Sequence, residues 1–586
     1  MRNVIAILAA CLSSGCGDDS GAPAADATVP DVGVDRPLPD APPPPGCPDA
    51  AGAGGTEATT PGEATLPYPT LRHISVEWMI EGDSDLDGVV SVRYRAAGAA
   101  WHGGFPLRRV PAGSAEGFSW ANKHSGSLFD LEPATTYEVE LALSDPDGGC
   151  EIRTLAATTR AVPAAAAGAR VVPVTSVTFA TAASSAAPGD ILELASGRYA
   201  GFTFTNDGTA TMPTVIRAAV RGGAVIDGDV RLDGRSHVYV DGLTVNGKIK
   251  FNGGNSLAIT HCNVTTTEDG ILTYTRSENL YIADNIVTGA TVWAEGSLGV
   301  DGNNIGEGIL VTGPGHVIEH NRVSGFRDGI SFLEDGEAVD QFSIDVIDND
   351  ISEAADDGIE ADFCFHNCRI VRNRLTNIFI ALSSQPGLGG PTWFIRNTMY
   401  NVILSAFKLQ RGSVGDVCLH NTAVKNGDAL GIYTNDVFSR QLFRNNVFIG
   451  GPGGEFGGWS SGSGRVAELR AADPSCDFDY DAYGSTLGTF AGNIGGTAFN
   501  SLAEMRSMTS EVHAIEVDLS AFQAGVTFPA SPFPALSVPD LRPASNGALI
   551  DQGTPLTGIN ESFAGSAPDI GAYETGQDLP AYGPRD

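Results

Sequence analysis

The chain has 586 residues, of which 73 are glycine and 18% are charged, and its formal net charge at pH 7 is −35. The length exceeds one ordinary hydrophobic core and predicts two or more domains. Many glycines with few charged residues argue against long helical coils and indicate a β-rich, turn-rich chain. The negative charge argues against nucleic acid as a partner, because phosphates would be repelled.

The first residues have the pattern of an export signal. Arg2 supplies a positive charge, and the apolar stretch from Val4 to Leu12 is too short to span a bilayer. The segment Leu12-Ser-Ser-Gly-Cys16 resembles the lipobox of bacterial lipoproteins, in which the cysteine is acylated. A second box ending at Cys11 leaves a shorter apolar stretch before it. We therefore expect a signal peptide over 1–16 and export from the cytoplasm of a bacterium. A lipid anchor at Cys16 would be the only contact with the membrane and would hold the protein at the cell envelope. An ordinary cleaved signal is the alternative.

Two further segments precede the main domain. Residues 17–64 are rich in Ala, Pro, Asp and Gly, which predicts a disordered tether. Residues 66–160 contain runs that alternate with period two, as half-buried strands do. Leu131-Glu-Pro-Ala-Thr-Thr-Tyr137 resembles the tyrosine corner of fibronectin type III domains, with Trp78 as the inner tryptophan. We expect a fibronectin type III-like β-sandwich over 66–160.

An asparagine recurs every 24 residues in the second half of the chain, at Asn349, Asn373, Asn397, Asn421 and Asn445. Upstream, Asn321, Asn285 and Asn263 precede this series by 28, 36 and 22 residues, which indicates inserted loops. Such a period is typical of one coil of a parallel β-helix. The asparagine would adopt the left-handed backbone of a tight turn, and its amide would bond the asparagine of the next coil.

The start and end of this region resemble a known superfamily. Pro188-Gly-Asp-Ile-Leu-Glu-Leu-Ala195 and Val238-Tyr-Val-Asp-Gly242 are similar to the opening coils of pectate-lyase-like right-handed parallel β-helices. They are closest to the group with alginate lyases and chondroitinase B, and Pro568-Asp-Ile-Gly-Ala-Tyr-Glu574 is similar to a common closing segment. The resemblance implies an all-β fold with a right-handed parallel β-helix over 170–576 that acts on an extracellular polysaccharide.

Glycine–isoleucine pairs fix which side chains point outward from the coils. If each isoleucine points inward, the next residue points outward. The outward row then reads Ser331, Glu360, Ser384, Lys408, Tyr433. The residues before the glycines are acidic, namely Asp269, Glu307, Asp328 and Asp357. Turn chemistry alone explains an Asp-Gly pair, whereas carboxylates stacked at one coil spacing also suit a bound Ca²⁺.

Charge is segregated along the chain. Residues 328–362 hold 13 acidic residues and no Lys or Arg, whereas residues 365–445 hold nine Lys or Arg and three Asp. This arrangement suits calcium-assisted β-elimination on a polyuronate, in which a cation acidifies the C5 proton and a base removes it. Our hypothesis places the cation at Asp357, Glu360 and Asp362, the base at Lys408 or Arg411, and the sugar against Ser384, Tyr433 and Trp393.

The family pattern is met in part. The resemblance implies a Glu-x-Glu calcium pair closely followed by a catalytic lysine; Glu360-Ala-Asp362 resembles the pair, but Asn367 stands near the position of the lysine. Polygalacturonase-like hydrolysis through Asp356 and Asp357 is an alternative. A non-catalytic glycan-binding or adhesion protein is a second alternative. Under each of these hypotheses we expect a monomer. Trp393 could equally lie in the core.

The cysteines and one acidic loop leave smaller questions open. Cys364-Phe-His-Asn-Cys368 predicts a small disulfide-closed loop, with a metal fragment as the alternative. The segment from Asp83 to Gly88 copies half of a calcium loop, but Tyr94 stands where the bidentate glutamate is required. We interpret it as an acidic loop between strands.

Overall fold

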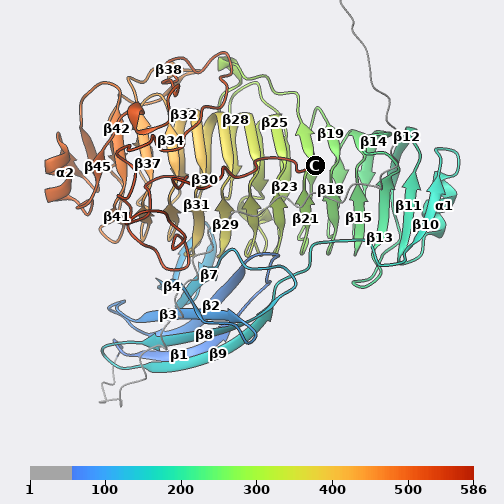
Figure 1. The fold of residues 1–586 in the computed structure, drawn as a ribbon, viewed down its shortest axis with the longest axis horizontal. Helices are drawn as coiled ribbons and strands as arrows, with labels where there is room; N and C mark the ends of the chain where they lie inside the picture. Colours follow the sequence, from blue (N-terminus) through green and yellow to red (C-terminus); the bar gives the residue numbers. More distant parts are fainter. Residues whose placement is uncertain (1–55) are drawn as a thin grey trace, which may run out of the picture. The chain divides into compact units, whose positions relative to one another are not determined.

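The computed structural model of the protein describes residues 56–586 (Figure 1). The predicted signal peptide with Cys16, and the predicted tether up to residue 55, lie outside the described residues. Within the described part of the chain, no helix is long and apolar enough to cross a membrane.

The first described domain is an antiparallel β-structure whose seven main strands follow the order β1-β2-β7-β4-β3-β8-β9. Their bounds are β1 (Thr59–Thr65), β2 (Ile74–Gly82), β3 (Val89–Ala96), β4 (His102–Val110), β7 (Lys123–Leu128), β8 (Thr136–Ser144) and β9 (Cys150–Thr158), with a small hairpin of β5 (Gly113–Ala115) and β6 (Phe118–Trp120). The domain begins at β1, inside the segment predicted to be tether.

The core of this domain explains the sequence signature. Trp78 is completely buried among Val76, Val90 and Leu141 in one apolar cluster. The backbone N–H of Glu132 donates to the Tyr137 hydroxyl at 2.9 Å. The predicted tyrosine-corner contact and inner tryptophan are therefore confirmed, while membership of the fibronectin type III family stays a prediction.

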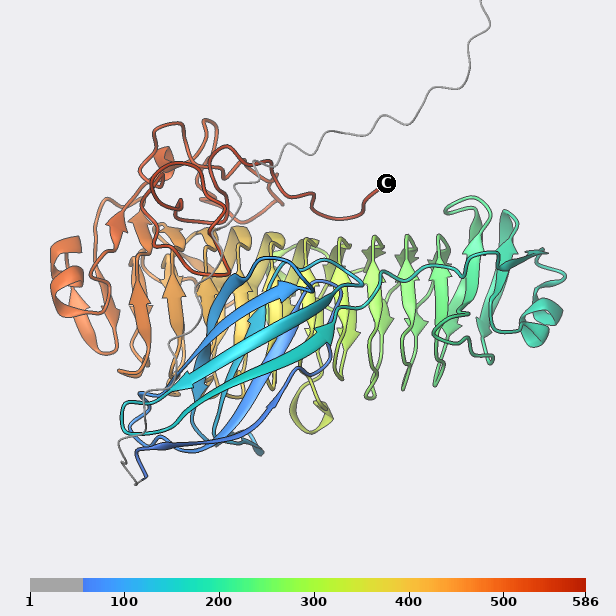
Figure 2. The ribbon, with the colours of Figure 1, turned by 60° about the horizontal axis from the view of Figure 1, so that its bottom comes forward.

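The second domain is a parallel β-helix, whose stacked coils are seen in Figure 2. One of its sheets has 13 parallel strands. They are β10 (Arg170–Val174), β11 (Asp190–Leu194), β13 (Thr214–Ala218), β15 (Val238–Asp241), β18 (Ala258–Thr260), β21 (Tyr281–Ala283), β24 (Val317–Glu319), β27 (Asp345–Ile347), β29 (Cys368–Val371), β31 (Thr392–Ile395), β33 (Val417–Leu419), β36 (Leu442–Arg444) and β41 (Asp477–Asp479).

The other long sheet has 17 strands. They are β12 (Gly197–Thr203), β14 (Ala224–Arg231), β16 (Thr244–Asn246), β17 (Ile249–Lys250), β19 (Asn263–Thr265), β20 (Ile271–Leu272), β22 (Ile286–Thr288), β23 (Glu307–Val311), β25 (Arg322–Phe326), β26 (Asp328–Phe332), β28 (Asp350–Glu360), β30 (Arg374–Ser384), β32 (Thr398–Leu409), β34 (Thr422–Val424), β37 (Val447–Gly450), β42 (Ala482–Ser485) and β45 (Ile515–Glu516). Each middle coil crosses this sheet twice, before and after a bend. We call the crossing after the bend the third face; it comprises β23, β26 and the C-terminal parts of β28, β30 and β32.

Short elements complete the fold. They are α1 (Phe179–Ser185), α2 (Leu502–Met508), β35 (Leu430–Gly431), β38 (Glu455–Phe456), β39 (Trp459–Ser460), β40 (Ala467–Leu469), β43 (Gly492–Ile494) and β44 (Thr497–Phe499), with single 3-10 turns at Glu295–Ser297, Asp335–Glu337 and Leu519–Ala521. β45 is the last strand of the β-helix sheets, and the segment up to the predicted end at residue 576 follows it.

The strand register places equivalent positions of successive coils next to each other in the core. On the third face, the aligned inward residues are Ile309, Ile330, Ile359, Leu382 and Phe407, and all are completely buried. Burying each such side chain contributes about 1.5–3 kcal/mol. The inward position of the isoleucines that follow glycine is therefore confirmed.

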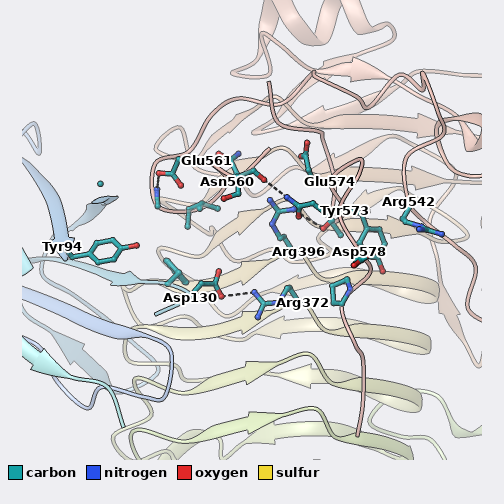
Figure 3. Close-up of a pocket in the computed structure, with 18 residues that line it drawn as sticks. Tyr94, Asp130, Arg372, Arg396, Arg542, Asn560, Glu561, Tyr573, Glu574 and Asp578 are labelled. Carbon is teal, nitrogen blue, oxygen red and sulfur yellow. Dashed lines mark hydrogen bonds and ion pairs between the residues drawn. The ribbon is translucent and has the colours of Figure 1, made fainter. Parts of the chain in front are cut away.

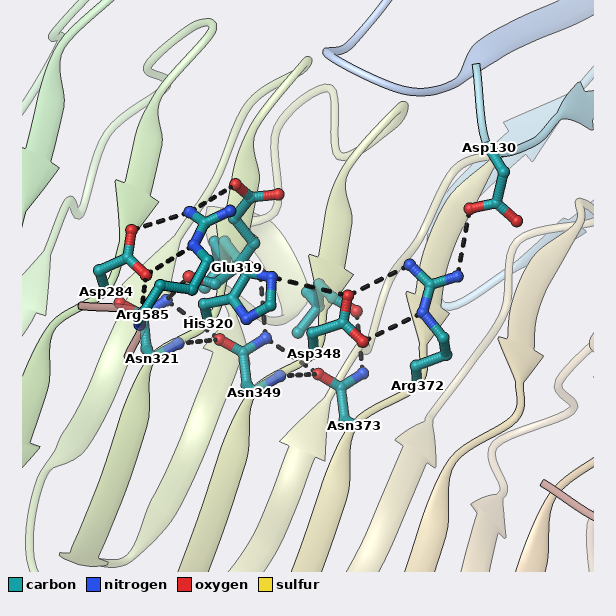
Figure 4. A network of polar contacts seen from close by, with 12 residues as sticks. Asp130, Asp284, Glu319, His320, Asn321, Asp348, Asn349, Arg372, Asn373 and Arg585 are labelled. Atoms are coloured by element: carbon teal, nitrogen blue, oxygen red, sulfur yellow. Dashed lines mark hydrogen bonds and ion pairs between the residues drawn. The ribbon is translucent and has the colours of Figure 1, made fainter. Parts of the chain in front are cut away.

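An asparagine ladder runs inside the turn between the two sheets. It consists of Asn285, Asn321, Asn349, Asn373, Asn397, Asn421 and Asn446, and ends on Asp481. Each side-chain amide donates to the carboxamide or carboxylate oxygen of the next coil at 2.8–3.0 Å. All seven asparagines are completely buried, and Figure 4 shows Asn321, Asn349 and Asn373 in line.

Three sequence expectations about the ladder are wrong. The left-handed residue is the one before each asparagine, such as Asp348 (φ 55°) or Arg372 (φ 52°). Asn445 (φ 60°) occupies this preceding position, so Asn446 takes the place in the ladder. Asn263 is exposed on β19, because Cys262 lies at the ladder position and donates its N–H to the Asn285 side chain.

The C-terminal segment returns along the turns of the β-helix. The Gly571 N–H donates to the Asn445 carbonyl at 2.7 Å, and the Gly583 N–H donates to the Asp348 carbonyl at 3.0 Å. Near the end of the chain, Arg585 pairs with Asp284 at 2.8 Å and Glu319 at 3.0 Å (Figure 4). These contacts hold the segment after the last coil against the solenoid.

Buried polar and aromatic contacts join the antiparallel domain to the 13-stranded sheet. Arg369, completely buried on β29, donates to Asp345 at 2.5 Å and to the hydroxyls of Ser75 and Ser127 at 2.9 and 3.1 Å. Asp345 also pairs with His73 at 2.9 Å. Because Arg369 and Asp345 of the β-helix both bond buried side chains of the antiparallel domain, the junction is specific.

We expect Asn373→Ala to lower the free energy of unfolding by about 2–4 kcal/mol, because it leaves polar groups of two neighbouring coils unpaired in the interior. Asn263→Ala removes the same amide from an exposed position and should change stability by less than about 0.5 kcal/mol. Urea unfolding followed by circular dichroism measures both. Equal effects of the two substitutions would contradict the ladder.

Candidate functional site

The third face carries one outward row of polar side chains on the four adjacent strands β26, β28, β30 and β32. Strand register aligns Ser331 with Glu360, Glu360 with Ser383, and Ser383 with Lys408. Ser383 therefore holds the place expected for Ser384, because β30 crosses the bend with one residue fewer than β28 and β32. Ser384 is completely buried and donates to Asp416 at 2.7 Å.

Lys408 lies among carboxylates from an earlier coil. Its ammonium group forms an ion pair with Asp357 and lies 3.5 Å from Glu360 Oε1. Asp357 is 1% exposed, whereas Glu360 and Lys408 retain 7% and 9% of their surface. Glu360 and Lys408 are therefore slightly exposed to solvent.

The acidic residues before the glycines stack as the sequence predicts, and they serve turn chemistry. The Asp357 N–H donates to Asp328 Oδ1 at 2.6 Å, and the Glu307 N–H donates to Asp269 Oδ1 at 3.2 Å. The carboxylates of Asp269 and Asp328 thus bind the backbone of the following coil. The same stacking leaves Glu307, Asp328 and Glu360 with oxygens within 4.8 Å of one another.

A second carboxylate group lies at the other end of the row. Glu334, Glu360 and Asp362 also have oxygens within 4.8 Å of one another. Asp362 Oδ1 accepts from the Ser383 hydroxyl at 2.5 Å and from the Gln385 N–H at 2.7 Å, but its buried Oδ2 has no hydrogen-bond partner. A group of three carboxylates, one of which has a buried oxygen without a partner, fits a hard cation such as Ca²⁺.

Burial and like charge shift the titration of the whole cluster. Burial, followed by repulsion from Asp357, raises the pKa of Asp356 to about 7. Burial likewise raises the pKa of Asp362 to about 7, and the pKa values of Asp328 and Glu360 lie well above their usual range. These carboxyl groups therefore hold protons or need cations near neutral pH.

Lys408 supplies a positive charge inside this cluster of carboxylates. Burial lowers its pKa, but attraction from Asp357, Asp362 and Glu360 outweighs burial, so that the pKa lies well above its ordinary value. Lys408 is therefore an ammonium ion as it stands. It could act as a base only after its carboxylate neighbours had been neutralised.

The other predicted site residues have their own partners. Arg411 pairs with Glu116 at 2.5 Å and with Asp335 at 2.6 Å, and these carboxylates raise its pKa. The Tyr433 hydroxyl donates to Asp428 at 2.9 Å. Trp393 is completely buried and packs against Phe105 and Phe129 at the domain junction, so its ring is not available to stack on a sugar.

Sequence reasoning missed several residues of the cluster. Arg327 lies 3.4 Å from Asp328 and 3.6 Å from Asp356, which makes it the second cation of the site. Glu334 completes the outer carboxylate group. Arg327 directly precedes the acidic block in sequence and Glu334 lies within it, but Glu334 follows β26, outside the repeated phrases that fixed register.

The predicted disulfide Cys364–Cys368 is present. It closes the loop that follows Glu360 and Asp362, and the metal alternative for these cysteines is wrong. The loop leads from the third face back to the 13-stranded sheet at β29.

Comparisons with known proteins identify no family. No family model matches the sequence, and no curated protein matches it. Among solved structures, the fold is similar to that titled "Structure of PL6 family alginate lyase AlyGC", with 12% identity and a TM-score of 0.32. The match covers 57% of this chain and spans 56% of that one, and it is too distant to transfer the role of any residue.

We expect Lys408→Met to destabilise the protein by about 3–5 kcal/mol at pH 8 in chelator, because it leaves buried carboxylates without a partner. Lys248→Met removes a lysine from an exposed pair with Glu268 and should cost less than about 1 kcal/mol. Thermal unfolding in chelator compares the two variants. Calcium should restore part of the loss in Lys408→Met, and no difference between the variants would contradict the charge balance described.

Proposed function

We propose that the protein acts on an extracellular acidic polysaccharide, and that the third face catalyses a cation-assisted β-elimination. The observation that carries this proposal is the position of Lys408, in register with the carboxylate row and within reach of two possible cation-binding groups. This arrangement combines a proton acceptor with a means of neutralising a uronate carboxylate.

Glu334, Glu360 and Asp362 would hold the cation. When bound, it would neutralise the carboxylate of the sugar and make the C5 proton more acidic. The bound cation would cancel the attraction of Glu360 and Asp362 for the Lys408 ammonium and would repel it, which would lower the Lys408 pKa against the remaining attraction of Asp357 and let Lys408 lose its proton to solvent. The neutral amine could then take the C5 proton, the C4–oxygen bond would break as a C4–C5 double bond forms, and the leaving oxygen would take up a proton from water.

A hydrolytic mechanism is the second candidate, and the titration of Asp356 favours it. A carboxyl group with a pKa of about 7 can donate a proton to a leaving glycosidic oxygen, while the Asp357 carboxylate beside it forms an ion pair with Lys408. In this case Lys408 remains an ammonium ion throughout and no cation is required.

We further propose that the chain is exported, anchored through Cys16 and monomeric, and that its antiparallel domain is a fibronectin type III-like sandwich. The support for these statements is the lipobox-like sequence at Leu12–Cys16 and the Tyr137 contact. A lipid anchor would place the third face outside the cytoplasm, where acidic polysaccharides occur.

The full chain should be mixed with polyuronates and glycosaminoglycans, in calcium or in chelator, while ultraviolet absorbance of the new double bond and reducing ends are both followed. We expect a calcium-dependent rise in absorbance on one polymer. Lys408→Ala and Asp362→Asn should each lower the rate by about 100-fold or more. Asp436→Asn, an exposed aspartate outside the site, is the matched control and should retain the activity.

The two readouts separate the candidates. Reducing ends that form without absorbance, in chelator, and that disappear in Asp356→Asn would establish hydrolysis and overturn elimination. If neither signal appears on any polymer of the panel, both catalytic proposals fail for these substrates.

A further inference from the structure

A cavity of about 380 Å³ lies away from the third face. Its walls come from Tyr94 and Asp130 of the antiparallel domain, from the turn residue Arg396, and from Tyr573 and Glu574 of the C-terminal segment (Figure 3). None of the carboxylates around Lys408 lines it. Ligand sites commonly have volumes of about 300–1,000 Å³, so this cavity can take one or two sugar rings.

Arg396 brings an unbalanced positive charge to this cavity. It occupies the left-handed turn position before Asn397, with φ 55°, so its side chain leaves the coil outward. Its guanidinium donates from Nη1 to the Ala572 carbonyl at 3.3 Å, and no carboxylate within residues 56–586 forms an ion pair with it. Burial lowers the pKa of Arg396, with attraction from Glu574 opposing that effect. A half-buried guanidinium without a counterion is costly and favours an anionic ligand.

The other charges of the walls are already engaged. Arg372 pairs with Asp130 at 3.1 Å and with Asp348 at 3.0 Å. Both carboxylate oxygens of Glu574 accept backbone N–H groups at 3.0 Å, and burial raises the pKa of Glu574 to about 7. The Arg396 charge is therefore the one that these neighbours leave uncompensated.

Hydroxyl and carboxylate groups add a second type of recognition. The Tyr94 hydroxyl points toward the cavity (Figure 3) and has no hydrogen-bond partner among the described residues. Glu561 uses one oxygen to accept the Gly558 N–H, and Asp578 is exposed beside Arg542. The cavity thus combines a guanidinium and a phenol as donors with carboxylates as acceptors. A ligand with one carboxylate and several hydroxyl groups matches this set.

We propose that this cavity is a binding site for a uronic acid, free or at the end of a chain, with the sugar carboxylate on Arg396 and a ring oxygen or hydroxyl on Tyr94. The acceptors Glu561 and Asp578 bind sugar hydroxyls. The surrounding carboxylates disfavour a second negative charge, so sulfate and phosphate bind less well. This site is separate from the third face and does not depend on catalysis there.

Titration calorimetry on the full chain, in chelator, tests the proposal with D-glucuronate, D-glucose and inorganic sulfate as probes. We expect saturable binding of glucuronate, at least tenfold weaker binding in Arg396→Gln and at least threefold weaker binding in Tyr94→Phe. Arg470→Gln, an exposed arginine elsewhere, should bind like the native chain.

Three results would overturn the site. They are no saturable binding of glucuronate, binding of glucose or sulfate as tight as that of glucuronate, and binding unchanged in Arg396→Gln. Tyr94→Phe removes a single hydroxyl and keeps the ring contacts, so it decides the question if Arg396→Gln does not fold.

Discussion

Every coil of the β-helix stacks on the previous one at a single strand spacing, and the rest of the structure follows from this constraint. A residue at one position of a coil faces the residue at the same position of the next, about 4.8 Å away. The constraint favours residues that pair with their own kind. Apolar side chains do so in the core, and asparagine does so in the turn because its amide carries both a donor and an acceptor.

Carboxylates at stacked positions are the opposite case. Glu307, Asp328 and Glu360 repel one another unless they hold protons or contact cations. Turn chemistry accounts for part of the row, since Asp328 binds the backbone of the next coil. It does not account for Glu360 or for the unpartnered oxygen of Asp362. Lys408 and Arg327 supply two positive charges. The carboxylates that remain without a positive partner are the groups on which the proposed chemistry depends.

Much of the fold could be predicted from the sequence, because coil stacking appears there as a period. The 24-residue interval placed Asn349, Asn373, Asn397 and Asn421 correctly, and failed at Asn445 because an additional residue moves the ladder to Asn446. The same effect displaced Ser384, since the bend of β30 is one residue shorter than its neighbours. Register can be counted only where the coil length stays constant.

Contacts across the domain junction left no periodic signal. The burial of Trp393 depends on Phe105 and Phe129, which lie in a domain with a different repeat. Arg396 resembles the other basic residues beside the ladder asparagines, and only the structure separates it from Arg372, whose charge is paired twice. The residue types of the catalytic proposal were visible in sequence, whereas the direction of the Lys408 pKa required the positions of its neighbours.

The most direct test of the account is the position of a cation on the third face. Crystals of the full chain soaked in calcium should give an anomalous difference peak within about 2.3–2.6 Å of oxygens from Glu334, Glu360 and Asp362. The Lys408 ammonium should then have moved away from Glu360. A map without such a peak at millimolar calcium, with Lys408 still against Asp357 and Glu360, would contradict cation-assisted chemistry at this site.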